Sequence, residues 1–178
     1  MYSLDEVSPT ARAMIKASKI PMYTVGYTLD DLDQTPAVDT VRKWVASVTS
    51  DKVVRSAGSK ACGLGLLLIG KPGTGKTTLA ATALQELIRT APQDLWSGRF
   101  GASFMDYPKL LRTQQRSWRD GGESDQEVID SIFGEGPKNL LTDVFVLDDL
   151  GKEYRTASGW AENIFDALVR ARFNAGLP

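Results

Sequence analysis

The sequence contains no histidine and only one cysteine, and these two shortages exclude several kinds of chemistry. Without histidine the chain cannot form a Ser-His triad, use imidazole as an acid or base, or bind a metal through imidazole. Cys62 has no partner for an intrachain disulfide and cannot form a thiolate cluster for zinc. Carboxylates, hydroxyls and backbone groups must therefore carry the chemistry of this chain.

Long apolar stretches are also missing. The N-terminal sequence MYSLDEVSPTARAMIK mixes charged and apolar residues, and no segment reaches the length of a signal peptide core or a membrane span. The 178 residues are 42% hydrophobic and carry a formal net charge of −1, which suits a single soluble domain with one core. We therefore expect a cytoplasmic protein without membrane contact.

Strands and helices are expected to alternate after a leader segment at 1–34. No core is expected in this leader, and its stretch TVGYTLDDLD is interpreted as extended chain followed by a turn. Thr35-Pro36 is typical of a helix start, and valines follow it at helical spacing, at Val38, Val41, Val45 and Val48. The apolar run at 64–69 predicts a strand buried on both faces, and TTLAATALQELIRT at 77–90 predicts a helix.

The stretch GKPGTGKTT at 70–78 joins that strand to that helix and matches the pattern G-x-x-x-x-G-K-[ST] of phosphate-binding loops. Gly73 and Gly75 allow successive N–H groups to form an anion nest at the helix N-terminus. Lys76 would reach the β- and γ-phosphates, and the Thr77 hydroxyl would bind Mg²⁺. An ordinary glycine-containing turn is the alternative. The predicted nucleotide-binding residues are Gly70, Lys71, Pro72, Gly73, Thr74, Gly75, Lys76, Thr77 and Thr78.

Two adjacent carboxylates follow the apolar residues of VFVLDDLG at 144–151. The apolar residues predict a second buried strand, and open α/β sheets bind ligands beyond the carboxyl ends of their strands. Asp148 would hold Mg²⁺ through water, and Asp149 could orient and deprotonate an attacking water. A helix cap or turn is the alternative for this motif alone. Together with the glycine loop, it predicts a site for a nucleoside triphosphate and Mg²⁺.

A basic helix is predicted between these two motifs. GASFMD at 101–106 is interpreted as a middle strand, and YPKLLRTQQRSWRD follows it directly. Its cations recur at steps of three and four residues and should share one helix face, formed by Lys109, Arg112, Arg116 and Arg119. A basic face with Trp118 nearby suits single-stranded nucleic acid through phosphate contacts and base stacking, and a solvated surface is the alternative.

Most of the chain resembles the DnaC/IstB family of AAA+ ATPases. The resemblance lies in GKPGTGKTTLA, in FMDYPKLLRTQQ and above all in VLDDLGKEYRTASGWAENIFDALVRARFNAGLP. The leader IPMYTVGYTLDDLDQTP is similar to the segment before the ATPase core of that family. The family includes bacterial and phage helicase loaders and transposition helper ATPases.

The resemblance implies roles for individual residues. Lys76 and Asp149 take the catalytic positions, and Asp148 takes the magnesium position with Thr77; many AAA+ proteins have glutamate where this chain has Asp149. The basic helix lies where initiator-type members of the superfamily carry a helix implicated in binding single-stranded DNA. In the family, the helix with Arg170 and Arg172 runs toward a neighbouring subunit; two solvated helix-end arginines are the alternative.

The resemblance also implies a fold class and a domain organisation. We expect an α/β P-loop fold of AAA+ type, with a leader at 1–34 and a partial ATPase core at 35–178 that lacks the sensor-1 strand and the lid. In the family that strand inserts between the glycine-loop strand and the Asp-Asp strand. These two strands should therefore not be hydrogen-bonded to each other.

The expected activity is Mg²⁺-dependent ATP hydrolysis, with ATP and Mg²⁺ as cofactors. A helicase loader would act on DNA and on a replicative helicase, and we expect the complete protein to form a homo-oligomer. The alternatives are a transposition helper that acts on a transposase, and an adaptor that binds ATP without hydrolysing it. A small-molecule kinase is less well supported, because no acceptor-binding signature is visible.

Overall fold

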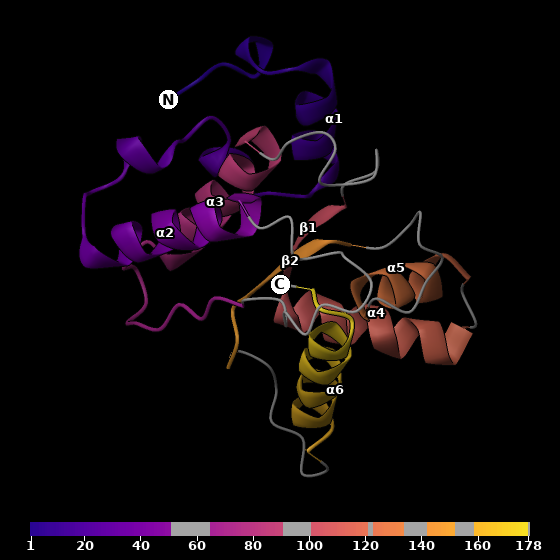
Figure 1. Ribbon diagram of the computed structural model, residues 1–178. Helices are drawn as coiled ribbons and strands as arrows, with labels where there is room; N and C mark the ends of the chain where they lie inside the picture. Colours follow the sequence, from indigo (N-terminus) through magenta and orange to yellow (C-terminus); the bar gives the residue numbers. More distant parts are fainter. Residues whose placement is uncertain (51–64, 91–100, 121–122, 134–141, 152–158, 178) are drawn as a thin grey trace.

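The computed structural model describes residues 1–50, 65–90, 101–120, 123–133, 142–151 and 159–177 (Figure 1). The helices are α1 (Pro9–Ala17), α2 (Pro36–Ser50), α3 (Lys76–Thr90), α4 (Tyr107–Asp120), α5 (Glu123–Phe133) and α6 (Trp160–Asn174). Three short 3-10 helices lie in the leader: η1 (Leu4–Glu6), η2 (Met22–Thr24) and η3 (Leu29–Asp31). The strands are β1 (Ala102–Asp106) and β2 (Val144–Asp148). The predicted helices at 36–48, 77–90 and 107–120 are confirmed.

The two strands form a parallel ladder in which Ala102 faces Val144 and Asp106 faces Asp148. The strands predicted at 101–106 and 144–147 are therefore confirmed. Successive side chains point to opposite faces of a strand, so alternate residues belong to different layers. Phe104 and Val144 contribute to the core on one face, and Met105 contributes to the core on the other.

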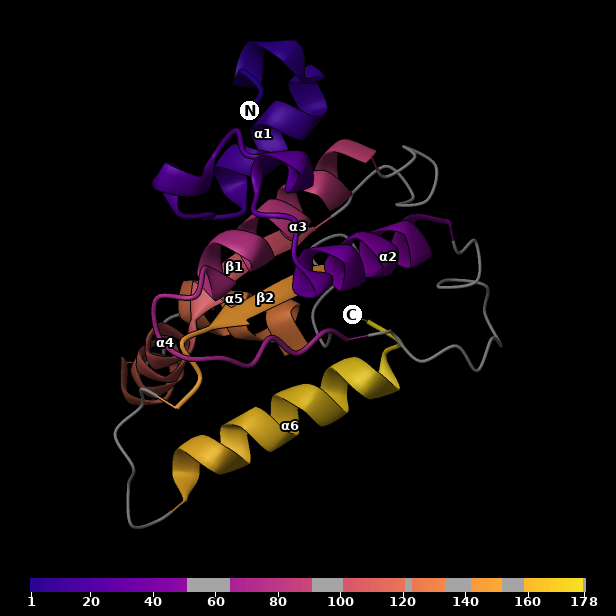
Figure 2. The same ribbon diagram turned by 90° about the vertical axis from the view of Figure 1, so that its left-hand side faces the viewer.

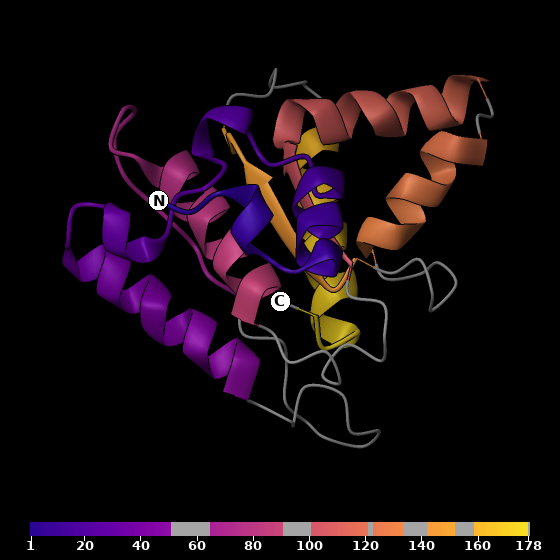
Figure 3. The same ribbon diagram turned by 90° about the horizontal axis from the view of Figure 1, so that it is seen from above.

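Helices cover both faces of this small sheet, as Figure 3 shows from above. The first core lies between the sheet, α1, α2 and α3, and its fully buried side chains include Val41, Leu84 and Leu87. The second core lies between the sheet, α4, α5 and α6, and includes Leu110 and Ile132. The result is an α/β arrangement with a helical layer on each side of a parallel sheet. In the described ranges, no helix combines the length and the apolar character needed to cross a membrane.

The leader contributes to the first core, and the expectation that it holds no core residues is wrong. Ala11, Ile15, Ile20 and Leu29 are buried there. The stretch expected to be extended contains η2 and η3 instead. The physical reason lies in α3, whose side chains are buried on most sides of the helix, so that it needs a cover beyond the sheet and α2. Scattered apolar residues in the leader supply that cover without forming a strong periodic pattern.

One buried side chain, Gln85 of α3, fastens the leader to the core. Its Oε1 accepts from the Tyr2 hydroxyl at 2.9 Å and from the Gly26 amide at 3.0 Å. Its Nε2 donates to the Thr24 carbonyl at 2.9 Å and to the Ala81 carbonyl at 3.2 Å. All four hydrogen-bonding positions of the amide are therefore satisfied. The leader also covers β1, whose Phe104 amide donates to the carbonyl of Ser18 at 2.7 Å.

The segment at 65–70 is not part of the sheet, so the strand predicted at 64–69 is not observed in its described part. Leu66 and Leu68 pack on the first core, whereas Leu67 and Ile69 are 68% and 84% exposed. The segment is drawn as coil rather than as an arrow in Figure 2. A strand needs a neighbouring backbone, and no ladder in the described chain reaches this segment. Within the described residues this segment forms no ladder with β2; because the segment is not a strand, the expected separation of two strands stays a prediction.

Candidate nucleotide site

The glycine loop has the backbone of a phosphate cradle. Gly73 and Gly75 have φ angles of 78° and 80°, in the left-handed region that side chains rarely adopt. Helix α3 begins at Lys76, directly after the second of these glycines. The first amide groups of a helix lack intrahelical partners, and the helix dipole adds positive character at this end. The loop therefore presents N–H donors where an anion can bind.

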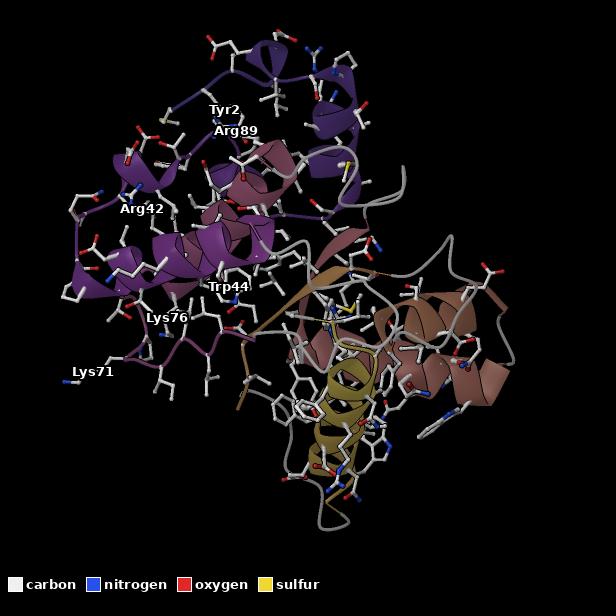
Figure 4. All side chains as sticks on the ribbon, in the orientation of Figure 1. Tyr2, Arg42, Trp44, Lys71, Lys76 and Arg89 are labelled. Atoms are coloured by element: carbon white, nitrogen blue, oxygen red, sulfur yellow. The ribbon has the colours of Figure 1, made fainter. Side chains whose placement is uncertain are left out.

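The two lysines of the loop lie differently. Lys71 points away from the protein, as Figure 4 shows, and is exposed. Lys76 folds over the loop, where its Nζ donates to the carbonyl of Lys71 at 2.7 Å and lies 3.5 Å from Oγ1 of Thr74. The ammonium group is thus held inside the turn that would surround the phosphates. The other predicted loop residues, Gly70, Pro72 and Thr78, lie in the loop or in the first turn of α3.

The structure brings the two predicted metal ligands into contact. Oγ1 of Thr77 donates to Oδ2 of Asp148 at 2.8 Å, although 71 positions separate these residues in the chain. Both side chains are partly buried. Hydroxyl and carboxylate oxygens are ligands that Mg²⁺ accepts, directly or through water. The donor set therefore fits Mg²⁺ at the junction of the loop helix and β2.

Asp149 follows β2 in an unusual backbone conformation. Its φ angle is 59°, one of two left-handed non-glycine residues in the described chain. Such conformations are uncommon and gather at functional sites, although aspartate tolerates them better than most residues do. Because of this left-handed turn, the side chain of Asp149 does not continue the alternating side-chain directions of β2. The two adjacent carboxylates therefore have different positions at the end of β2.

A third carboxylate, Asp106, was missed by the sequence analysis. It ends β1 as the register partner of Asp148 in the ladder. Register partners in a parallel pair point to the same face, and this face carries α3, because Phe104 and Val144 on it pack in the first core. The signal was present in the sequence, since GASFMD also ends in aspartate after an apolar run. Strand-end carboxylates in parallel sheets lie at one common edge.

Comparison with known proteins decides the family. Residues 66–171, more than half of the chain, match the family described as ATPase family associated with various cellular activities (AAA). The chain belongs to this family. No curated protein and no solved structure matches it. The matched range contains the glycine loop, both strands and the Asp-Asp motif, which are the parts that meet in the geometry above.

The predicted basic face is present on α4 of the AAA core. Arg112, Gln115, Arg116 and Arg119 line a shallow depression of about 380 Å³, and Lys109 is exposed one turn earlier. The opposite side of α4 is buried against α5 and includes Leu110 and Ser117. The helical spacing deduced from the sequence is therefore confirmed as one solvent-facing surface.

Trp118 lies beside this basic face rather than within it. The residue is 61% exposed, and its ring packs edge-on against Trp160 of α6, with the ring centroids 5.8 Å apart. The contact ties the C-terminal half of α4 to the start of α6.

The two arginines expected at a subunit interface have different environments. Arg170 is exposed and forms an ion pair with Asp166 at 2.7 Å. Arg172 is only 7% exposed, and its guanidinium donates to the carbonyls of Ile132, Thr142 and Asp143 at 2.8, 3.1 and 3.0 Å. Burial lowers the pKa of Arg172 to about 10, which leaves it charged at neutral pH. In this chain Arg172 is neither solvated nor presented to another subunit.

Proposed function

We propose that this AAA chain binds ATP with Mg²⁺ at the glycine loop and hydrolyses it. The observation that carries the proposal is the 2.8 Å hydrogen bond between Thr77 and Asp148. An ordinary glycine-containing turn does not require its hydroxyl to contact the carboxylate at the end of a distant strand, as Thr77 contacts Asp148. P-loop nucleotide sites hold Mg²⁺ between these two residue types.

Each residue of the site has a distinct task in this proposal. Amide groups around Gly73 and Gly75 bind phosphate oxygens, and Lys76 stabilises the negative charge that develops during transfer of the γ-phosphoryl group. Bound Mg²⁺ would neutralise charge on the phosphate oxygens. Asp149 orients the attacking water and accepts its proton. Aspartate is one methylene shorter than glutamate, and the left-handed turn at Asp149 gives the side chain a direction of its own.

We propose that ATP hydrolysis changes how the protein holds single-stranded DNA and a replicative helicase. The resemblance to DnaC/IstB proteins and the basic face of α4 support this assignment. Four cations on one solvent-facing surface, bordered by the exposed ring of Trp118, suit a flexible chain of phosphates and bases. The alternatives are a transposition helper that acts on a transposase and an adaptor that does not hydrolyse ATP. Assembly as a homo-oligomer is part of the proposal.

Two substitutions test the nucleotide site. Lys76→Ala should abolish binding of a fluorescent ATP analogue, because it removes the cation that faces the phosphates. Asp149→Asn should retain binding and lower turnover about 100-fold or more, as expected when a positioned base is lost. Lys43→Ala, which removes an exposed cation from α2, is the matched control. Unchanged nucleotide affinity in Lys76→Ala would reject the site, and absence of turnover in the wild type with DNA present would favour the adaptor.

The nucleic-acid assignment is tested by salt dependence. Binding of a single-stranded oligonucleotide should weaken as salt rises, with about 0.7 in the log–log slope for each phosphate contact. Alanine at Lys109, Arg112, Arg116 and Arg119 together should flatten that slope. A control with alanine at the exposed Lys16 and Lys43 should keep it. If the fourfold variant binds like the wild type, the basic face is only a solvated surface.

A further inference from the structure

We propose that Gln115, in the middle of the basic face of α4, binds the open Watson–Crick edge of an unpaired nucleobase. The inference rests on the proposed function, because it requires a nucleic-acid strand on α4. It deepens that function by naming the residue that distinguishes a base-bearing strand from other polyanions. Gln115 is a specificity-determining residue, whereas the arginines around it bind the phosphates that all nucleic acids share.

The first step of the argument is the position of Gln115. It lines the depression on α4 together with Arg112, Arg116 and Arg119. Residues three and four apart are neighbours on a helix surface, so Gln115 lies between Arg112 and Arg119, and Arg116 follows it directly. At 1.5 Å per residue the three arginines span about 10 Å of the helix axis, and Gln115 lies about 4.5 Å from the first. A strand that contacts all three arginines therefore passes over Gln115.

The second step is the chemistry of the depression. Among the four described residues that line it, Gln115 alone has a side-chain acceptor, because a guanidinium group has five N–H donors and no acceptor. Phosphate oxygens only accept hydrogen bonds, and their charge-assisted bonds to guanidinium are about twice as strong as neutral ones. We therefore expect the phosphates to bind the arginines. Oε1 of Gln115 can bind only a group that donates a hydrogen bond.

The third step is that the amide of Gln115 can bind a ligand without losing an internal contact. The residue is exposed, and its side chain has no hydrogen-bond partner in the described part of the chain. The preceding residue, Gln114, differs in this respect, since it is 6% exposed and lies on the buried side of α4. Of these two adjacent glutamines, only Gln115 is presented to a strand in the depression.

The donor that fits this amide is found on nucleobases. Every base carries at least one N–H group and one acceptor on its Watson–Crick edge, and an amide can accept from the first and donate to the second. In a duplex the opposite base occupies this edge. In a single strand the edge is open, so the amide of Gln115 should recognise unpaired bases of any identity.

The test compares how the full chain binds oligo-dT and an oligonucleotide of equal length made from N3-methylthymidine. The methyl group removes the N–H donor of the Watson–Crick edge and leaves every phosphate and the base ring in place. Wild-type protein should bind oligo-dT about fivefold more tightly, the usual effect of one hydrogen bond. Gln115→Met should bind the two oligonucleotides equally, with the salt dependence of the wild type, because its arginines are unchanged.

Two further variants separate the loss of the acceptor from a general effect of substitution. Gln115→Glu keeps an acceptor and adds a negative charge, so it should bind both oligonucleotides more weakly than the wild type and still prefer oligo-dT. Asn174→Leu removes an exposed amide from the end of α6 and is the matched control. It should keep both the affinity and the preference of the wild type.

Two results would overturn the role of Gln115. One is salt-dependent binding in which Gln115→Met keeps the preference for oligo-dT, since another group would then contact the base edge. The other is equal binding of the two oligonucleotides by the wild type. Failure of the proposed function is distinguishable and also removes the inference, because wild-type protein would then bind neither oligonucleotide in a salt-dependent manner.

Discussion

Each of the two helical layers contains a buried polar side chain that makes several hydrogen bonds between elements, and these two side chains differ in charge. Gln85 joins the leader to α3 on one side of the sheet, and Arg172 joins α6 to the end of α5 and the start of β2 on the other. Gln85 is fully buried and neutral, whereas Arg172 is 7% exposed and charged.

The difference reflects what each layer has to satisfy. The leader offers both donors and acceptors to α3, and an amide can serve both kinds. The other layer presents three carbonyl groups near one point, and a guanidinium supplies only donors. A charge removed from water must keep all its partners to be tolerated. The free energy of unfolding should therefore fall more when Arg172 is replaced than when Gln85 is replaced.

Arg172→Met should have the largest effect of three substitutions that test this comparison. It fills the space but leaves three carbonyls without a donor, and we expect the free energy of unfolding to fall by about 3–5 kcal/mol. Chemical denaturation measures this loss. The control is Arg170→Met, two positions away and exposed, which should change the free energy of unfolding by less than about 1 kcal/mol. Equal losses in the two variants would contradict the structural role of Arg172.

Gln85→Leu should have the second largest effect on the free energy of unfolding. Leucine is apolar and of similar volume, but the amide of Gly26 and the carbonyl of Thr24 lose their partner, and we expect a loss of about 2–3 kcal/mol. Hydrogen exchange should show the loss locally, as faster exchange of the Gly26 amide. Gln115→Leu changes an exposed glutamine of α4 and should leave that amide protected. A larger loss here than in Arg172→Met would reverse the comparison between the layers.

Tyr2→Phe should have the smallest effect. It removes one of two donors to Oε1 of Gln85, while the phenyl ring keeps its place beneath Arg89, whose guanidinium carbon lies 4.2 Å from the ring centroid (Figure 4). We expect a loss of about 1 kcal/mol. In a Gln85→Leu background the same change should cost less, because the hydrogen bond is already gone. Strict additivity of the two changes would show that Tyr2 acts independently of Gln85.

Local signals made several elements predictable. The helix start at Thr35-Pro36, the glycine loop and the apolar run before Asp148 each contain their information within a few residues. The segment at 65–70 has an equally apolar sequence, yet it forms no ladder with a described strand. A strand exists only where a second backbone lies beside it, and apolar character does not specify that neighbour. The prediction for the leader was wrong for a different reason. The spacing of its buried residues follows neither the period of a helix nor that of a strand over a long enough stretch to be recognised.

The sequence by itself predicted the class of chemistry, because glycines, a lysine and a hydroxyl at fixed spacing after an apolar segment match the pattern of a phosphate-binding loop. It also determined the basic face of α4, since helical periodicity alone gathers those cations. Only the tertiary structure decided that Thr77 meets Asp148, that Asp106 stands beside them and that Arg172 is buried. These contacts join residues far apart in the chain, and their formation depends on how the layers pack rather than on any local pattern.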